Sequence, residues 1–294
     1  MKRIALFLLA VILLYGCSPA EPNADIAATT LPVYDFTLFL CQNTSLTVTR
    51  LVTEEVSCLH DYTLNVRQVK SAEAADLIVI SGAGLEDFMD DILTDTTSID
   101  ASEGIALLCP EEHDHQEHGH DHGHETHSHD SDPHIWLSPV HAKTMADNIC
   151  LGLQEKYPQY RDVFAQNLSA LHQKLDALQS YGKEQLSSLT CRELITFHDG
   201  FAYFADAFDL TILEAVEEES GREASAKELI HMIEEVQHHN LPAIFTEVSG
   251  SVSAAGIITR ETGCTVHALD MAMTGSGYFE AMYHNINTVK EALQ

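Results

Sequence analysis

A long amphipathic stretch in the middle of the chain constrains the fold more than any other feature. No β-strand pattern occurs from Pro139 to about residue 188, and after Pro158 apolar residues recur every three or four positions. These apolar residues are Tyr160, Phe164, Leu168, Leu171, Leu175 and Leu178. The spacing predicts one helix of roughly thirty residues, ~45 Å long, with a single apolar face. Because strand patterns lie on both sides of it, this helix separates two lobes.

Each of the two halves alternates short β-branched runs with helical patterns. Predicted strands cover residues 46–52, 76–81 and 104–109 in the first half and 193–198, 211–216, 243–248 and 265–270 in the second. Predicted helices cover residues 66–75, 84–93, 225–240 and 251–263. This alternation is typical of mainly parallel sheets flanked by helices, an α/β fold. We therefore expect an N-terminal lobe at 25–157, a linking helix at 158–188 and a C-terminal lobe at 189–294.

The N-terminus reads as an export signal. Met1-Lys2-Arg3 is followed by 13 uncharged, mostly apolar residues, "IALFLLAVILLYG", a run too short to span a bilayer comfortably. The run ends at Gly16-Cys17, which resembles the cleavage box of bacterial lipoproteins, where the cysteine is lipidated. We expect a signal peptide at 1–16, lipidation of Cys17 and a tether at 17–24. The anchor would hold the protein at the extracytoplasmic side of a membrane, facing the periplasm or the outer cell surface.

Charge and cysteine usage exclude some classes of function and leave others open. The formal net charge is −30, from 45 acidic against 15 basic residues, so the chain repels nucleic acid. Six cysteines follow Cys17 without any C-x-x-C pair. In an exported chain they allow fifteen disulfide pairings, and buried free thiols are an equal alternative.

One segment, residues 111–132, is dominated by histidine, aspartate and glutamate. Residues 111–136 hold nine of the eighteen histidines in the chain. No apolar residue lies between His113 and Asp132, so we expect a disordered loop in the absence of metal. Neutral imidazoles bind zinc and copper, which predicts many weak, interchangeable sites. The loop histidines are His113, His115, His118, His120, His122, His124, His127 and His129.

A tight zinc site needs about four nitrogen, oxygen or sulfur donors on rigid elements. His60, His198 and Asp270 lie at or just after the carboxyl ends of predicted strands, and His134 lies in a turn that enters a helix. In open α/β sheets these ends face the ligand crevice. Two residues come from each half, which predicts a site in the cleft between the lobes. Position alone leaves a structural role for each histidine equally open.

Five segments resemble a known family, in the family's order. They are "LHDYTLNVRQVKSAEAADLIVISGAGLEDFM", "DPHIWLSP", "ITFHDGFAYFADAFDL", "REASAKELIHMIEEVQHHNLPAIFTEVSGS" and "ALD" followed by "GYFEAMYHN". Together they look like the zinc-uptake solute-binding lipoproteins of bacterial ABC transporters, the ZnuA-like and TroA-like group. The resemblance implies two α/β lobes joined by one long helix, a metal ion in the cleft and a monomeric protein. It also implies an ABC permease and its ATPase subunit as partners.

Carried over by position, His60, His134, His198 and Asp270 match the four metal ligands of this family. The family usually continues from the aspartate as Asp-Pro-Leu-Gly, whereas Asp270 is followed by "MAMTGSG". This departure weakens the assignment of Asp270 and leaves Glu247, in "FTEV", as a possible substitute. Manganese members usually have a carboxylate at the third position, where this chain has His198. Three imidazoles and one carboxylate suit zinc better than manganese.

Two other functions compete with zinc import. Three-histidine zinc sites with an open position activate water, but the chain has no H-E-x-x-H, G-x-S-x-G or G-x-x-x-x-G-K-[ST] motif. We therefore expect no enzyme, with a zinc hydrolase as a remote alternative. A surface adhesin or a passive zinc-buffering lipoprotein is the nearer alternative. A buffer would need only the histidine-rich loop, whereas the cleft residues predict one ordered site.

Overall fold

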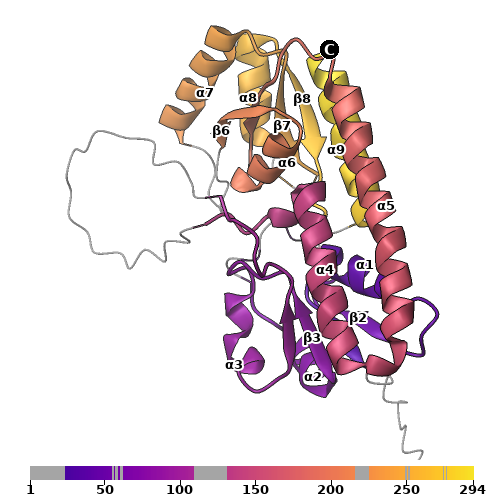
Figure 1. The fold of residues 1–294 in the computed structure, drawn as a ribbon. Helices are drawn as coiled ribbons and strands as arrows, with labels where there is room; N and C mark the ends of the chain where they lie inside the picture. Colours follow the sequence, from indigo (N-terminus) through magenta and orange to yellow (C-terminus); the bar gives the residue numbers. More distant parts are fainter. Residues whose placement is uncertain are drawn as a thin grey trace, which may run out of the picture.

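The N-terminal lobe is built on a four-stranded parallel sheet. The computed structural model describes residues 24–54, 56, 59, 62–108, 131–215, 225–248, 250, 252–273, 275 and 277–294. The strands are β1 (Ile26–Ala28), β2 (Val48–Arg50), β3 (Leu77–Ile80) and β4 (Ser98–Asp100), in the order β2-β1-β3-β4. Helices α1 (Leu31–Leu40), α2 (Val66–Ala74) and α3 (Asp90–Leu93) flank the sheet, with the 3₁₀ turn η1 (Asp87–Met89) before α3 (Figure 1).

The C-terminal lobe repeats this arrangement. Its strands are β5 (Glu193–Thr196), β6 (Thr211–Ala215), β7 (Ala243–Glu247) and β8 (Thr265–Leu269), all parallel in the order β6-β5-β7-β8. Its helices are α6 (Ala202–Ala207), α7 (Ala226–His239), α8 (Ser253–Thr262) and α9 (Tyr278–Leu293). The first strand of each lobe along the chain, β1 or β5, lies inside its sheet, and all carboxyl ends in a sheet lie at one edge. The predicted two-lobe α/β fold is confirmed.

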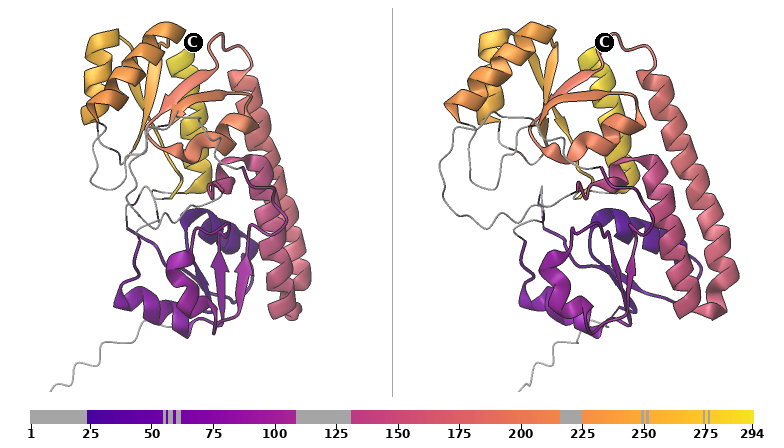
Figure 2. Two further views of the ribbon diagram at one scale, coloured as in Figure 1. Left: turned by 90° about the vertical axis from the view of Figure 1, so that its left-hand side faces the viewer. Right: turned by 60° about the vertical axis from the view of Figure 1, so that its left-hand side comes forward.

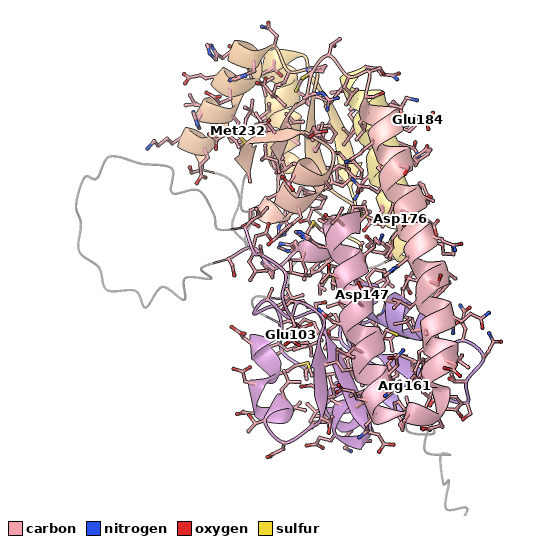
Figure 3. All side chains as sticks on the ribbon, in the orientation of Figure 1. Glu103, Asp147, Arg161, Asp176, Glu184 and Met232 are labelled. Carbon is pink, nitrogen blue, oxygen red and sulfur yellow. The ribbon has the colours of Figure 1, made fainter. Side chains whose placement is uncertain are left out.

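Long helices connect the lobes. After the 3₁₀ turn η2 (Ile135–Leu137), α4 (Pro139–Lys156) leads through the 3₁₀ turn η3 (Pro158–Tyr160) into α5 (Arg161–Leu186), which has 26 residues. Helix α5 runs along one side of the molecule past both lobes, with α4 beside one half and α9 beside the other (Figures 1 and 2). Lys143 contacts Asp176 at 2.6 Å across α4 and α5, and Figure 3 shows Asp176 and Asp147 on these adjoining helices. The linking helix expected from the sequence is therefore present.

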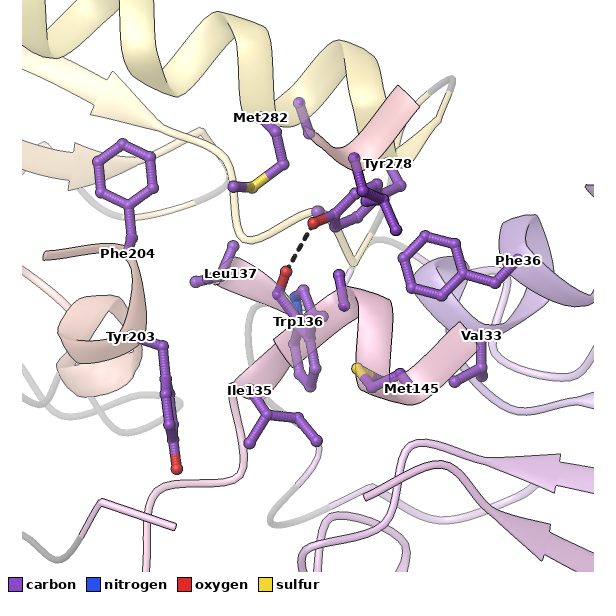
Figure 4. Packing of buried hydrophobic residues seen from close by; sticks show 14 of the residues in the cluster. Val33, Phe36, Ile135, Trp136, Leu137, Met145, Tyr203, Phe204, Tyr278 and Met282 are labelled. Carbon is purple, nitrogen blue, oxygen red and sulfur yellow. Dashed lines mark hydrogen bonds between the residues drawn. The ribbon is translucent and has the colours of Figure 1, made fainter. Parts of the chain in front are cut away.

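One hydrophobic core continues from lobe to lobe. Phe36 of α1, Trp136 of η2 and Tyr278 of α9 are all fully buried in the same cluster (Figure 4). The Tyr278 hydroxyl donates a hydrogen bond to the Trp136 carbonyl at 2.8 Å, and Trp136 Nε1 donates to the Met271 carbonyl at 2.8 Å. Buried aromatic side chains contribute strongly to packing, and here they also satisfy their polar atoms across the lobes. The only tryptophan of the chain thus joins the two lobes.

The strand expected at 104–109 is wrong over its described residues, 104–108. Gly104 lies in a turn at φ +76°, and residues 105–108 have no regular structure. Ile105 and Leu107 pack against the core from this irregular segment, which produces the strand-like alternation. The fourth strand of the sheet is instead β4, which pairs with β3.

Two further observations concern the cysteines and the membrane. Cys41, Cys150, Cys191 and Cys264 are free thiols, and Cys58 and Cys109 lie outside the described residues.

No helix within the described residues has the length and apolar character needed to cross a membrane. The expected signal peptide and Cys17 also lie outside that part of the chain and remain predictions.

Candidate metal centre

Three polar side chains come from neighbouring strand ends in the C-terminal lobe. His198 lies two residues beyond β5, Glu247 is the last residue of β7, and Asp270 directly follows β8. Strand β7 lies between β5 and β8, so Glu247 emerges between the other two residues. Carboxyl ends of parallel strands share one edge, which explains why residues far apart in sequence meet here.

Two imidazoles face each other at this edge. His134, at the entry to η2, is 2% exposed and His198 is 8% exposed. Their Nε2 atoms lie 3.4 Å apart. In a tetrahedral zinc site with Zn–N bonds of about 2.0–2.1 Å, two nitrogen ligands lie ~3.3–3.4 Å from each other. The two Nε2 atoms are therefore spaced as ligands of one zinc ion.

A carboxylate contacts the opposite nitrogen of each ring. Asp132 Oδ1 lies 2.8 Å from His134 Nδ1 and also accepts a hydrogen bond from the His134 backbone N–H at 2.8 Å. Glu247 Oε1 lies 3.1 Å from His198 Nδ1, and its side chain is 4% exposed. Such carboxylates keep the proton on Nδ1, which leaves the Nε2 lone pair for a metal. Glu247 thus contacts the nitrogen of His198 that does not face His134.

A glycine allows the rings to approach. A Cβ atom on Gly200 would lie 2.5 Å from Met271 Cε, 2.8 Å from His198 Cδ2 and 2.9 Å from His134 Cγ. Non-bonded carbon atoms favour separations of about 3.5–4.0 Å, so any side chain at this position would displace the rings. Gly200 lies in the 3₁₀ turn η4 (Asp199–Phe201), directly after His198. The same contacts place Met271, the neighbour of Asp270, beside both imidazoles.

Asp270 is held by its own neighbours and, within the described part of the chain, makes no hydrogen bond with either imidazole of the pair. Its Oδ1 accepts a hydrogen bond from the Ala272 backbone N–H at 2.7 Å. Asn285 fixes its main chain, because Oδ1 accepts from Asp270 N and Nδ2 donates to Asp270 O, both at 2.7 Å. Burial raises the pKa of the Asp270 carboxyl, and the hydrogen bond from Ala272 opposes this. Within the described residues, no three His, Cys, Asp or Glu side chains converge as a metal-binding group.

His60, the remaining predicted ligand, lies outside the described residues, but both flanks of its segment are fixed. Gln68 Nε2 donates to the Leu51 carbonyl at 2.9 Å on one flank and to the Tyr62 hydroxyl at 2.6 Å on the other. The Tyr62 hydroxyl in turn donates to Glu54 at 2.7 Å. Leu51 and Tyr62 are therefore both tied to Gln68 in the first turn of α2.

The eight loop histidines, from His113 to His129, also lie outside the described residues. The described residues on either side of them are held together. Asp132 N donates to the Leu108 carbonyl at 2.9 Å. The Tyr203 hydroxyl bridges the same two residues: it donates to the Asp132 carbonyl at 2.9 Å and accepts from Leu108 N at 2.8 Å. Leu108, which precedes the histidine-rich segment, is therefore bonded directly to Asp132, the partner of His134.

Comparisons with known proteins identify the family of the chain. The family profile described as "Zinc-uptake complex component A periplasmic" (ZnuA) matches residues 26–292. The chain belongs to the ZnuA family. A putative metal-binding protein of Treponema pallidum is 27% identical over 79% of this chain and 76% of the relative. The zinc-binding lipoprotein AdcA of Streptococcus pneumoniae is 29% identical over 99% of this chain, which spans 61% of the length of AdcA. A crystal structure of ZnuA superposes with a TM-score of 0.77 at 27% identity, covering 92% of this chain and all of the other.

Two carboxylates beside the imidazole pair are not among the residues predicted from the sequence. Asp132 contacts His134 Nδ1, and Asp199 Oδ1 lies 3.7 Å from His198 Nε2. Both are adjacent or nearly adjacent to a predicted ligand, in "DPH" and "HD". The carboxylate in "DPH" is a readable signal, because ligand imidazoles usually bond a carboxylate through the nitrogen that does not bind the metal, as Asp132 does with His134 Nδ1.

Proposed function

We propose that this chain is the extracytoplasmic zinc-binding component of an ABC importer. It captures zinc between the lobes with His60, His134, His198 and Asp270 and delivers the ion to a membrane permease driven by an ATPase subunit. The observation that carries the proposal is the pair of buried Nε2 atoms, 3.4 Å apart. Each ring is backed by a carboxylate, as in protein zinc sites generally.

The donor set favours zinc as the cargo. Imidazole nitrogens suit zinc, whereas manganese prefers oxygen donors. Four protein ligands would close the tetrahedral shell, which suits a carrier, because a zinc hydrolase keeps one position open for water. The relative AdcA is named as a zinc-binding lipoprotein, which supports the same ion.

The location and the loop complete the proposal. Cys17 would be lipidated and hold the protein at the membrane that carries the permease. The histidine-rich segment would bind additional zinc weakly and release it beside His134, since its flanking residues are tied together at Asp132. Replacing Cys17 by Ala should release the protein from the membrane fraction in a cell-fractionation experiment.

Zinc titration of the protein without residues 1–16 tests the division between cleft and loop. One tight zinc ion and a variable set of weaker ones are expected. Deletion of residues 113–130 should remove only the weaker set. If this deletion removes the tight binding event, the tight site is in the loop and the proposal is wrong.

Substitution of the ligands tests the cleft itself. His134→Ala or His198→Ala should each weaken the tight event by a large factor in the loop-deleted protein. His231→Ala is the matched control, because His231 also pairs with a carboxylate, Glu214 at 2.9 Å, but on the exposed surface. X-ray absorption of the one-zinc protein should show about three nitrogens near 2.0 Å and one carboxylate oxygen. An exchangeable water as a full ligand would favour the hydrolase.

A further inference from the structure

Two carboxylates contact His198, one on each side of its ring. Glu247 is buried and lies against Nδ1. Asp199 Oδ1 lies 3.7 Å from Nε2, and the Asp199 side chain is 48% exposed. Because Nε2 is also the atom that faces His134 Nε2, Asp199 lies on the side of the ring where zinc would bind. The two carboxylates therefore have different surroundings and different access to the ion.

The backbone explains why Asp199 reaches this side. His198 is extended, with φ −159° and ψ 143°, and the chain turns immediately into η4 at Asp199. In a continuing strand, successive side chains would point to opposite faces. The turn instead directs the Asp199 carboxylate toward the distal nitrogen of its neighbour. Proximity along the sequence alone would not produce this contact.

Exposure separates Asp199 from the other candidate ligands. His134 and His198 are buried, and the Asp270 carboxylate is engaged by the Ala272 backbone N–H. Asp199 has nearly half its side chain in solvent and an oxygen within 3.7 Å of a buried donor atom. It can therefore meet a hydrated ion in water and still reach the site.

We propose that Asp199 is the entry and exit ligand of the zinc site. Its carboxylate displaces a water molecule from the hydrated ion, holds the ion beside His198 Nε2, and adds a transient Zn–O bond while the imidazoles form or break their bonds. Zinc sites expand to five ligands in this way during reactions. The inference rests on the proposed function. A group that stabilises the state shared by binding and release accelerates both, so its removal slows both.

The test compares Asp199→Asn with Asp206→Asn in the chain without residues 1–16. Asp206 lies on α6, a short distance along the same segment, and is exposed, so its replacement removes the same charge without touching the site. Stopped-flow fluorescence of Trp136, whose ring centroid is 5.4 Å from that of His134, follows zinc at the cleft rather than in the loop. Substoichiometric zinc measures association, and mixing with excess EDTA at several concentrations measures dissociation.

Both rates should fall in Asp199→Asn by similar factors of about fivefold or more, equivalent to about 1 kcal/mol in the barrier. Rates equal to those of Asp206→Asn would overturn the inference. Slower association alone would show that Asp199 only attracts the cation electrostatically. Faster dissociation alone would show that it is an ordinary equilibrium ligand. Either outcome refutes a role in exchange. Normal affinity and normal rates in Asp199→Asn would refute only this inference. Tight zinc binding that persists in His134→Ala would refute the proposed function.

Discussion

The contact between Glu247 and His198 can be altered without changing the size of the side chain. Glu247→Gln replaces the buried carboxylate, 3.1 Å from Nδ1, by a neutral amide. The amide no longer holds the proton on Nδ1 through a charge, and its NH₂ group can donate to Nδ1 instead. That contact would favour the ring with its proton on Nε2, the nitrogen needed for zinc. We therefore expect weaker zinc binding in a protein that still folds.

The size of the effect follows from the burial of the pair. Hydrogen bonds to charged groups contribute about 1.5–3 kcal/mol. At about 1.4 kcal/mol per factor of ten, this corresponds to about 10- to 150-fold in affinity. Loss of a carboxylate behind a ligand histidine typically reduces metal affinity by about 10- to 100-fold. Both routes predict a loss of one to two orders of magnitude for Glu247→Gln.

Competition titration against a zinc chelator of known affinity measures this loss, and thermal melting of the zinc-free protein checks that the fold is intact. Glu214→Gln is the matched control, because it removes a carboxylate that lies 2.9 Å from His231 on the surface. Zinc affinity equal to wild type in Glu247→Gln, or an equal loss in Glu214→Gln, would refute the reasoning. Loss of a zinc-bound oxygen in the X-ray absorption spectrum would show instead that Glu247 is itself a ligand.

Three further changes test the site and the stability of the fold. Gly200→Ala should weaken zinc binding and lower the melting temperature, because the added Cβ would overlap both imidazoles. Gly256→Ala in α8 is the control: a Cβ there has nothing within 4 Å, so the change should stabilise the protein by about 0.5–1 kcal/mol. Asn285→Ala should lower the urea midpoint, because it leaves the partly buried N–H and C=O of Asp270 without their Asn285 partners, at up to about 1–3 kcal/mol each. Burial raises the pKa of Glu86 from 4.5 to about 7, so the folded chain keeps a proton that the unfolded chain has lost. This contribution to stability, about 3 kcal/mol, is present below the pKa of Glu86 in the unfolded chain and is lost as pH rises through its pKa in the folded chain. Glu86→Gln should therefore flatten the slope of stability against pH that urea titrations of the zinc-free protein measure.

Local signals in the sequence were sufficient for most helices. Asn65 caps α2, where its side chain accepts from the N–H groups of Arg67 and Gln68 directly before the helix predicted at 66–75. Ser225 and Glu228 form a capping box that starts α7 at the expected place. Strands β1 and β2 have three residues each, too few for alternation to define their limits. The false strand at 104–109 arose because an irregular segment also alternates between core and solvent.

The site was predictable only up to the positions of its residues. Parallel strands bring their carboxyl ends together, so His198 and Asp270 could be placed at one edge from their places in the sequence. The role of Glu247 depends on the strand order β5-β7-β8, which the order of the strands along the chain does not determine. The sequence therefore offered Glu247 as a possible ligand, whereas the structure places it against Nδ1 of His198. The contribution of His60 stays a prediction.

Buried hydrogen bonds between the lobes oppose their wide separation. Trp136 lies two residues after His134 and donates to the carbonyl of Met271, which follows Asp270. Tyr278 donates to the Trp136 carbonyl through its hydroxyl and to Asp35 of α1 through its backbone N–H at 2.7 Å. Wide separation of the lobes would break these hydrogen bonds, at about 1–3 kcal/mol for each buried group left unpaired, and would expose the indole ring. Local movement of ligands is the less costly route, and it requires a donor near solvent beside the buried pair. We therefore expect the buried Glu247 and the partly buried Asp132 to hold the imidazoles in place for affinity, and exchange to use the exposed side of the site, where Asp199 lies.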